Sequence, residues 1–407
     1  MQKQYINLYS AITALSSSLD LVGVDEIKHG KRVALMALRI AQHLDWSEAE
    51  CLSILYAGML HDCGVSRIRE HRNLTGELEW EGAEEHCIRG YEYLSCCPPL
   101  ASLALEIRYH HTRWEKLLDL PIDQRCRLRA NLLFLADRID VLQAPFLNKE
   151  QILVEYHAII NRIATYSGTL FAPELVSTFV EIADVEAFWL AMEPEYLDED
   201  LRQFGINIKP IELDNVTLKE VAELFSKVVD AKTHFTHDHS VLVAKVARQL
   251  AIDLGIESTT LDQIEIAGLL HDIGKLRVSE DIINKPGKLT PVEIASMHRH
   301  SYDTFRILNR VFTDSKIPIW AGLHHENLRG EGYPFHTHIE ALDLECRIIC
   351  IADIFQALCQ NRPYRHRMEL ATILEHLEDL VNTGRLDPLV FKTLQANAEK
   401  YYEMAIQ

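Results

Sequence analysis

The sequence predicts an all-α chain made of two tandem helical domains. The chain has 407 residues, which is too long for one ordinary core and suits two domains of roughly 200 residues each. Long segments free of Gly and Pro carry apolar residues at helical spacing, and no series of alternating apolar and polar residues predicts a sheet. The two halves of the chain also repeat one pattern of histidines and aspartates.

This repeat sets the predicted domain limits. The spacing of 32 residues between His29 and His61 recurs between His239 and His271, and a spacing of 24 residues recurs further along each half. The first half contains His29, His61, Asp62, His86, His110, His111 and Asp137. The second half contains His239, His271, Asp272, His300, His324, His325 and Asp353. An offset of about 210 residues indicates duplication of one domain. We expect domains at 1–197 and 213–407, joined by a polar linker at 198–212 that carries Gly205 and Pro210.

Individual helices follow from periodicity and end signals. Residues 239–255 place apolar side chains at helical spacing over an uninterrupted run. Thr290 precedes Pro291 and stands three residues before Glu293, so a capping box predicts a helix that begins there.

Composition restricts the classes of partner. A formal net charge of −19 disfavours general binding to DNA or another nucleic-acid backbone. No apolar run reaches the roughly 18 residues of a membrane span, and the N-terminus does not resemble a signal peptide. Nine cysteines without a CxxC pair predict reduced, mostly buried thiols. We therefore expect a cytoplasmic protein that does not bind membranes.

The repeated residues in the second half predict a binuclear metal site. Seven nitrogen and oxygen donors from at least four segments are too many for one tetrahedral ion and suit two divalent ions bridged by a carboxylate. We assign Asp272 as the bridge, with His239, His271 and Asp353 on one ion and His300, His324 and His325 on the other. Two cations would lower the pKa of a bridging water, which would attack phosphorus. Iron, manganese, nickel and zinc all fit this donor set. A single His-Asp pair could arise by chance, but its recurrence at fixed spacing argues against that.

Five motifs in the second half resemble the HD-GYP phosphodiesterases, a branch of the HD metal-dependent phosphohydrolases. They are HDIGK (271–275), INKPGKLTPVE (283–293), HHENLRGEGYP (324–334), IADIFQAL (351–358) and NRPYR (361–365). The resemblance implies an enzyme that hydrolyses a 3′–5′ phosphodiester bond of a bacterial cyclic dinucleotide and releases a linear dinucleotide. It also implies the metal ligands assigned above.

The resemblance assigns further site residues. Lys275 would act with Asp272 in catalysis and would also contact the substrate phosphate. Arg362 and Arg365 would contact the same phosphate. Gly332, Tyr333 and Pro334 would form the rim of the site or a surface for a protein partner. On general grounds Lys275 is also consistent with an ordinary helix-end lysine, the arginines with exposed ion pairs, and Gly-Tyr-Pro with a simple turn.

Three positions depart from the family pattern. Arg329 replaces an aspartate in the GYP segment, and Gln356 replaces an aspartate after the metal ligand Asp353. Phe235 stands where some members carry a glutamate that binds a third metal, so we expect two metals.

The first half retains the ligand residues but not the substrate residues. Val65 replaces the lysine, Thr112 replaces the glutamate of HHE, and no GYP segment follows. Two interpretations stay open here, namely a metal-binding regulatory domain without catalysis, and a structural remnant whose histidines pack or hydrogen-bond.

The tandem arrangement favours 3'3'-cGAMP as the substrate, and cyclic di-GMP stays an alternative. A non-catalytic cyclic dinucleotide sensor or adaptor, and another HD nucleotide phosphohydrolase, are the competing functions. The intact second-half ligands argue against the sensor, and the GYP and RPYR segments argue against the other hydrolase. The sequence leaves open a homodimer and further processing of the product.

Overall fold

The structure is a computed structural model that describes residues 6–20, 28–65, 82–147, 151–207, 211–232, 238–361 and 366–406. Contacts between Cα atoms divide the chain into two units, one over Asn7–Glu212 and the other over Leu213–Gln407 together with Met1–Ile6. We call these the N-terminal unit and the C-terminal unit. Arg362, Arg365 and Phe235 lie outside the described residues.

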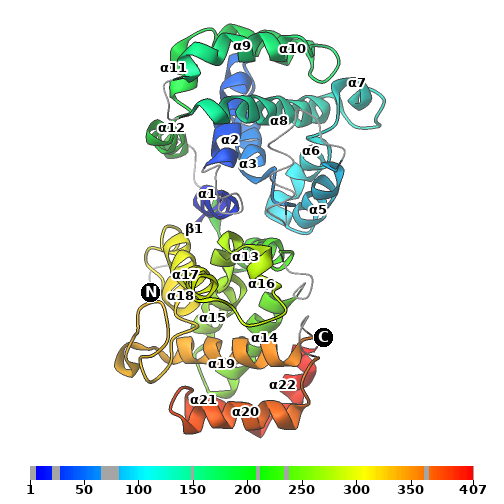
Figure 1. Ribbon diagram of the computed structural model, residues 1–407. Coiled ribbons are helices and arrows are strands. Elements are labelled where there is room, and N and C mark those ends of the chain that lie inside the picture. Colours follow the sequence, from blue (N-terminus) through cyan, green and yellow to red (C-terminus); the bar gives the residue numbers. More distant parts are fainter. Residues whose placement is uncertain are drawn as a thin grey trace. The chain divides into compact units, whose positions relative to one another are not determined.

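The N-terminal unit is helical throughout its described part (Figure 1). Its helices are α1 (Leu8–Leu19), α2 (His29–His43), α3 (Glu48–Leu60), α5 (Glu84–Ser95), η1 (Pro98–Leu103), α6 (Ala104–Tyr109), α7 (Trp114–Leu117), α8 (Gln124–Gln143), η2 (Ala144–Phe146), α9 (Ile152–Ala164), α10 (Pro173–Ala183), α11 (Glu186–Leu190) and α12 (Pro194–Asn207).

The C-terminal unit repeats this helical architecture. Its helices are α13 (Asn215–Asp230), α14 (His239–Asp253), α15 (Ser258–Leu270), η3 (Ile273–Arg277), α16 (Glu280–Ile283), α17 (Pro291–Leu308), α18 (Ile317–Gly322), η4 (Ile339–Ala341), α19 (Leu344–Cys359), α20 (Leu370–Asn382), α21 (Pro388–Ala396) and α22 (Ala398–Ala405). Two-residue strands β1 (Ile6–Asn7) and β2 (Glu212–Leu213) form the one sheet among the described residues. The prediction of an all-α fold is confirmed.

Three mutually packed helices form the core of each unit. In the N-terminal unit these are α2, α3 and α8; in the C-terminal unit they are α14, α15 and α19 (Figure 1). The pair α5 and α6 in the first unit corresponds to α17 and α18 in the second, and the members of each pair are in contact. The duplicated sequence therefore yields a duplicated helix arrangement, with equivalent histidines on equivalent helices or directly after them.

A glycine permits a close helix contact in each core. A Cβ built on Gly268 of α15 would lie 2.8 Å from Ala244 Cα of α14, and one on Gly58 of α3 would lie 2.6 Å from Ala34 Cα of α2. Real Cβ atoms do not approach a backbone atom so closely, so a larger residue would force the helices apart. These contacts fix the distance between the helices that carry the predicted metal ligands.

The predicted start of α17 is confirmed. Thr290 Oγ1 accepts a hydrogen bond from Glu293 N, and Glu293 Oε2 accepts one from Thr290 N at 2.7 Å. This reciprocal pair satisfies backbone donors that the first helical turn leaves free. The helix then runs to Leu308 and places His300 in its interior.

The stretch expected as a linker is largely helical. Helix α12 continues to Asn207, and its Leu197 and Leu201 are buried. Asp198 pairs with Lys28 and Lys31 of the N-terminal unit at 2.8 and 3.0 Å. Polar residues and Gly205 suggested a linker in the sequence, but apolar contacts at helical spacing and these ion pairs attach the segment to the N-terminal unit.

The remaining expectations concern cysteines and membranes. All nine cysteines are reduced thiols, and every one except Cys96 is buried. Within the described part of the chain, no helix is both long and apolar enough to cross a lipid bilayer.

Gly268→Val tests the close approach of α14 and α15. We expect the free energy of unfolding of the C-terminal unit to fall by about 2 kcal/mol or more, because the added isopropyl group would overlap the backbone of α14. Urea unfolding of the full chain measures the change. Gly287→Val is the matched control, since a side chain at Gly287 would meet no atom within 4 Å. An equal loss of stability in both variants would contradict this packing argument.

Candidate metal centres

The seven predicted ligands of the C-terminal unit converge from separate helices. His239 begins α14, His271 ends α15, and Asp272 precedes η3. His300 lies within α17, His324 and His325 follow α18, and Asp353 lies in α19. Six of the seven are buried, the exception being the partly exposed His325. The fold therefore brings together residues that are up to 114 positions apart in the sequence.

The two carboxylate oxygens of Asp272 face different sets of histidines. Asp272 Oδ2 lies 3.2 Å from His271 Nε2 and 3.7 Å from His239 Nε2. Asp272 Oδ1 lies 3.5 Å from His300 Nε2 and 3.7 Å from His324 Nε2. Ligand atoms that each lie about 2.0–2.2 Å from one ion are roughly 3–3.5 Å apart. The spacing therefore suits one cation on each side of this carboxylate.

Asp353 completes the donor set on the first side. Its Oδ1 atom lies 3.3 Å from His239 Nε2 and 3.8 Å from His271 Nε2. The ligating atoms of these three residues all lie within 4.8 Å of one another, as do those of His300, His324 and His325 on the other side. This grouping matches the assignment made from the sequence.

Hydrogen bonds at Nδ1 direct the other ring nitrogen toward Asp272. His271 Nδ1 donates to Gly268 O at 2.6 Å, and His324 Nδ1 donates to Ala321 O at 2.7 Å. His300 Nδ1 donates to Met297 O in the same way. A carbonyl can only accept, so each Nδ1 carries the hydrogen and a neutral ring has its lone pair at Nε2. Such outer contacts commonly fix metal-binding imidazoles.

The buried donor atoms receive only partial compensation from the protein, since His300 Nε2 has Ser301 Oγ at 3.3 Å. His300 Nε2 and His324 Nε2 are 3.4 Å apart, and burial lowers the pKa of His300 to about 3 and that of His324 well below its usual value. Two neutral lone pairs therefore oppose each other at this distance. Asp272 Oδ1 is also buried without a hydrogen-bond partner among the described residues. A divalent cation would satisfy all of these atoms, so the residues fit a metal centre.

The carboxylates remain charged although they are buried. Burial raises the pKa of Asp272, but His271 and Lys275 outweigh this effect and hold it well below its usual value. Burial likewise raises the pKa of Asp353, and His239 and His271 reverse the shift. Ionised oxygens are the form that binds cations.

Lys275 and the GYP segment lie beside this cluster. Lys275 Nζ forms an ion pair with Asp272 Oδ2. Tyr333 stacks on His298 with ring centroids 3.7 Å apart, and its ring lies 4.8 Å from that of His325. A Cβ on Gly332 would lie 2.4 Å from Glu326 Cα, so the loop requires glycine there. Pro334 follows Tyr333 on the same half-buried loop.

Two residues contribute in ways that the sequence argument did not identify. Gln356 Oε1 accepts a hydrogen bond from His239 Nδ1, which orients this ligand as the carbonyls orient the others. Glu326 is buried and accepts hydrogen bonds from Phe335 N at 2.7 Å and Thr337 N at 3.0 Å. Glu326 thus holds the loop that carries Tyr333. The position of Gln356, one helical turn after Asp353, was the available signal.

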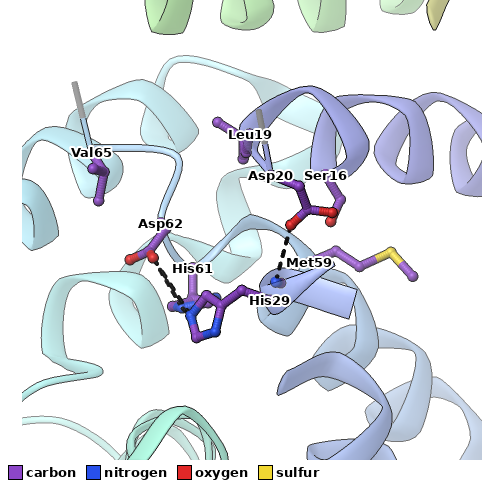
Figure 2. Close-up of a pocket in the computed structure, with 9 residues that line it drawn as sticks. Ser16, Leu19, Asp20, His29, Met59, His61, Asp62 and Val65 are labelled. Atoms are coloured by element: carbon purple, nitrogen blue, oxygen red, sulfur yellow. Dashed lines mark hydrogen bonds and ion pairs between the residues drawn. The ribbon is translucent and has the colours of Figure 1, made fainter. Parts of the chain in front are cut away.

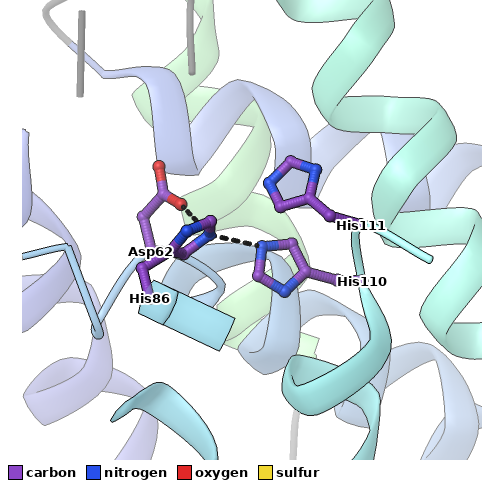
Figure 3. Close-up of side chains that lie close together, drawn as sticks. All are labelled: Asp62, His86, His110 and His111. Atoms are coloured by element: carbon purple, nitrogen blue, oxygen red, sulfur yellow. Dashed lines mark hydrogen bonds and ion pairs between the residues drawn. The ribbon is translucent and has the colours of Figure 1, made fainter. Parts of the chain in front are cut away.

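The N-terminal unit brings its seven residues together in the same pattern. Asp62 Oδ2 lies 3.4 Å from His61 Nε2 and 3.8 Å from His29 Nε2, and Asp62 Oδ1 lies 3.5 Å from His86 Nε2. Figure 3 shows the His86 ring between the Asp62 carboxylate and the His110 ring, with His111 adjacent. Asp137 Oδ1 lies 3.4 Å from His29 Nε2.

A small cavity of about 20 Å³ adjoins this N-terminal cluster. Its lining consists of Ser16, Leu19, Asp20, His29, Gly30, Met59, His61, Asp62 and Val65. Figure 2 shows His29, His61 and Asp62 grouped on one side of the cavity, and Asp20 with Ser16 on another. This volume holds about one water molecule.

Comparison with known proteins identifies two HD domains. Residues 27–142 match the HD-domain family HD, and residues 223–390 match the HD-domain family HD_5. HD domains are metal-dependent, in agreement with the donor sets described above. The two matches fall in different units of the structure.

Relatives resemble the chain over different lengths. It is 40% identical to "3'3'-cGAMP-specific phosphodiesterase 1" of Vibrio cholerae, over 98% of this chain and 94% of that protein. It is 35% identical to a cyclic di-GMP phosphodiesterase of Pseudomonas aeruginosa, over 39% of this chain and 38% of that protein. A crystal structure of a V. cholerae cyclic GMP-AMP phosphodiesterase matches with a TM-score of 0.65 and 24% identity, covering 97% of this chain and 98% of that one. This structural likeness supports the fold.

Gln356→Leu tests the orientation of His239. We expect the affinity of the C-terminal unit for Mn²⁺ to fall by about 10- to 100-fold, because the ring loses the acceptor that fixes it. Electron paramagnetic resonance of free Mn²⁺ during titration measures the affinity. Gln356→Glu keeps an acceptor for His239 Nδ1, so this variant should bind Mn²⁺ more tightly than Gln356→Leu does. The exposed Gln395→Leu is the control, and equal affinities in all proteins would refute this role.

Glu326→Gln tests the attachment of the GYP loop. The variant replaces a carboxylate that accepts two backbone hydrogen bonds with an amide that offers one acceptor oxygen. We expect faster amide hydrogen exchange at Phe335 and Thr337, together with lower turnover. Exchange measured by mass spectrometry gives the first result. Unchanged exchange over 333–337 would show that Glu326 does not hold the loop.

Proposed function

Since this chain belongs to the HD-domain cyclic dinucleotide phosphodiesterases, we propose that its C-terminal unit hydrolyses 3'3'-cGAMP at the Asp272 cluster and releases a linear dinucleotide. The observation that carries this proposal is the position of Asp272, whose two oxygens face separate histidine sets at 3.2–3.7 Å. A carboxylate placed in this way can hold two metal ions close together, as two-metal hydrolysis of a phosphodiester needs.

The donor set limits the cofactor to divalent metal ions that accept nitrogen and oxygen ligands. We assign one divalent ion to His239, His271, Asp272 and Asp353, and a second to Asp272, His300, His324 and His325. Nitrogen and oxygen donors without sulfur suit iron, manganese or nickel, and zinc also fits. When bound, such ions supply Lewis-acid activation of the attacking water and of the phosphate oxygens.

The protein residues orient and neutralise the reacting groups. Water oxygen bonds to phosphorus as one bond from phosphorus to a sugar oxygen breaks, and that sugar oxygen takes up a proton. Lys275, paired with Asp272, places a cation beside the cluster, where it stabilises negative charge that develops on the phosphate. Arg362 and Arg365 remain assigned to phosphate contacts from the sequence alone.

The GYP residues contribute a wall of the same site. Tyr333 covers the ring of His325, and Gly332 allows the loop to approach the residues after His325. We propose that Gly332, Tyr333 and Pro334 border the substrate and hold His325 in place. Contact of this loop with a partner protein, and a homodimer, stay predictions of the sequence.

The choice between 3'3'-cGAMP and cyclic di-GMP rests on how much of this chain each relative matches. The relative named for 3'3'-cGAMP matches both units, whereas the cyclic di-GMP relative matches 39% of the chain. This favours 3'3'-cGAMP, with cyclic di-GMP as the alternative.

Asp272→Ala tests the proposed reaction. We expect loss of turnover by more than about 100-fold with Mn²⁺ present, because both metal positions lose a shared ligand. Chromatography of products from 3'3'-cGAMP and cyclic di-GMP measures the rate and gives kcat/KM for each substrate. Chelation of metal should abolish the wild-type activity, and added Mn²⁺ should restore it.

Lys275→Gln provides a graded variant of the same experiment. We expect reduced kcat/KM with retained metal, since Lys275 contacts the phosphate and is not itself a metal ligand. The exposed Lys288→Gln is the control for general loss of charge. Full turnover in Asp272→Ala would contradict the proposed site, and a higher kcat/KM for cyclic di-GMP would reverse the substrate order.

A further inference from the structure

We infer that the N-terminal unit binds a pair of divalent cations of its own, bridged by Asp62. This inference is independent of the reaction proposed for the C-terminal unit. Asp62 separates its two oxygens between two donor groups, as Asp272 does. His29, His61 and Asp137 form one group with ligating atoms within 4.8 Å of each other. Asp62, His86, His110 and His111 form the other.

Two imidazoles of this cluster, His61 and His110, are oriented by the same kind of contact as in the C-terminal unit, whereas His86 Nδ1 is buried without such a contact among the described residues. His61 Nδ1 donates to Gly58 O at 2.8 Å, and His110 Nδ1 donates to Ile107 O at 2.6 Å. Both acceptors lie three residues earlier on the same helix, as they do for the equivalent His271 and His324. The Nε2 atoms therefore point toward Asp62, which is the arrangement that cation binding needs.

His29 is held by a carboxylate rather than an amide. Its Nδ1 donates to Asp140 Oδ2 at 2.7 Å, and Arg32 binds both oxygens of Asp140, at 2.6 and 2.9 Å. Asp140 stands where the C-terminal unit has Gln356. Arg32 balances the charge of Asp140, so this outer carboxylate orients His29 without adding net negative charge to the cluster.

A different basic side chain lies beside the N-terminal ligands. The lysine position is Val65, but the buried Arg138 forms an ion pair with Asp137 Oδ2. Its counterpart after Asp353 is Ile354. Arg138 leaves Asp137 Oδ1 directed at His29 Nε2, at 3.4 Å. Each unit thus pairs one basic side chain with a carboxylate of its cluster. In the C-terminal unit Lys275 pairs with the bridging Asp272, and in the N-terminal unit Arg138 pairs with the terminal ligand Asp137.

The position of the basic side chain explains why the N-terminal unit could bind metal and yet not bind a substrate phosphate. The side chain of Asp62 is 15% exposed, whereas that of Asp272, which Lys275 contacts, is 3% exposed. The cavity of about 20 Å³ beside Asp62, His29 and His61 leaves room for a water molecule as an additional ligand. Arg138 is buried against Asp137, so it stabilises the ligand set without being available to a phosphate.

The competing explanation is that protons, rather than metals, join the ring nitrogens. His29 Nε2 and His61 Nε2 are 3.3 Å apart, and His86 Nε2 and His110 Nε2 are 3.2 Å apart. A proton between each pair would satisfy these contacts and leave no site for a cation. Direct measurement of metal in the full chain distinguishes the two.

The experiment uses a full-length variant whose C-terminal centre is disabled, Asp272→Ala with Asp353→Ala. After loading with Mn²⁺ and removal of unbound ions, we expect it to retain about half of the wild-type metal, because one two-metal site remains. Mass spectrometry of the metal gives the content, and electron paramagnetic resonance should show the coupled signal of a bridged Mn²⁺ pair. Adding Asp62→Ala should remove both the metal and the signal.

The result does not depend on the folding of an N-terminal variant, because the doubly substituted protein leaves that unit unchanged. Absence of bound Mn²⁺ from this protein overturns the inference and favours shared protons. Mn²⁺ that persists after Asp62→Ala also overturns it, because the metal would then lie elsewhere. Turnover of cyclic dinucleotide that survives Asp272→Ala with Asp353→Ala would instead refute the proposed function, while the metal content still decides this inference.

Discussion

The central constraint of each unit is that one aspartate faces two groups of imidazole nitrogens inside the protein. Asp272 and Asp62 each divide their oxygens between these groups at 3.2–3.8 Å. Lone pairs and carboxylate charge at such distances are unfavourable in a buried site unless a metal cation or shared protons lie among them. His61 and His271, which directly follow α3 and α15, each deliver one of these nitrogens to the cluster.

Helix ends meet this constraint with local contacts. His271 and His324 each donate Nδ1–H to a carbonyl three residues earlier, so the backbone of the same helix sets the direction of Nε2. Close helix packing then sets the distance between donors, as Gly268 and Gly58 permit. The orientation of each imidazole is therefore set by local contacts, whereas the distance between donor atoms is set by tertiary packing of the helices. This division explains how the N-terminal unit retained the donor arrangement after losing the residues suited to phosphate.

The two units differ in where their positive charge lies and in the loops beside the metal ligands. Lys275 contacts the bridging carboxylate, where it can also reach a phosphate, whereas Arg138 is buried on the terminal carboxylate. Glu326 holds the loop that places Tyr333 on His325, and Thr112 occupies the corresponding position of the N-terminal unit. One duplicated arrangement thus supports, as we propose, an enzyme site in one unit and, as we infer, a separate metal site in the other.

The sequence by itself determined the helical class and the duplication, and it predicted the fourteen residues that the structure gathers into two clusters, because helical periodicity and fixed spacing are properties of local sequence order. It also predicted the start of α17, since a capping box involves only neighbouring residues. Only the tertiary structure decided that Gln356 and Asp140 orient the first histidine of each cluster, that Arg138 replaces Lys275 as the nearby cation, and that α12 packs on the N-terminal unit. These features depend on which side chains meet across helices distant in sequence, and no local pattern specifies such contacts.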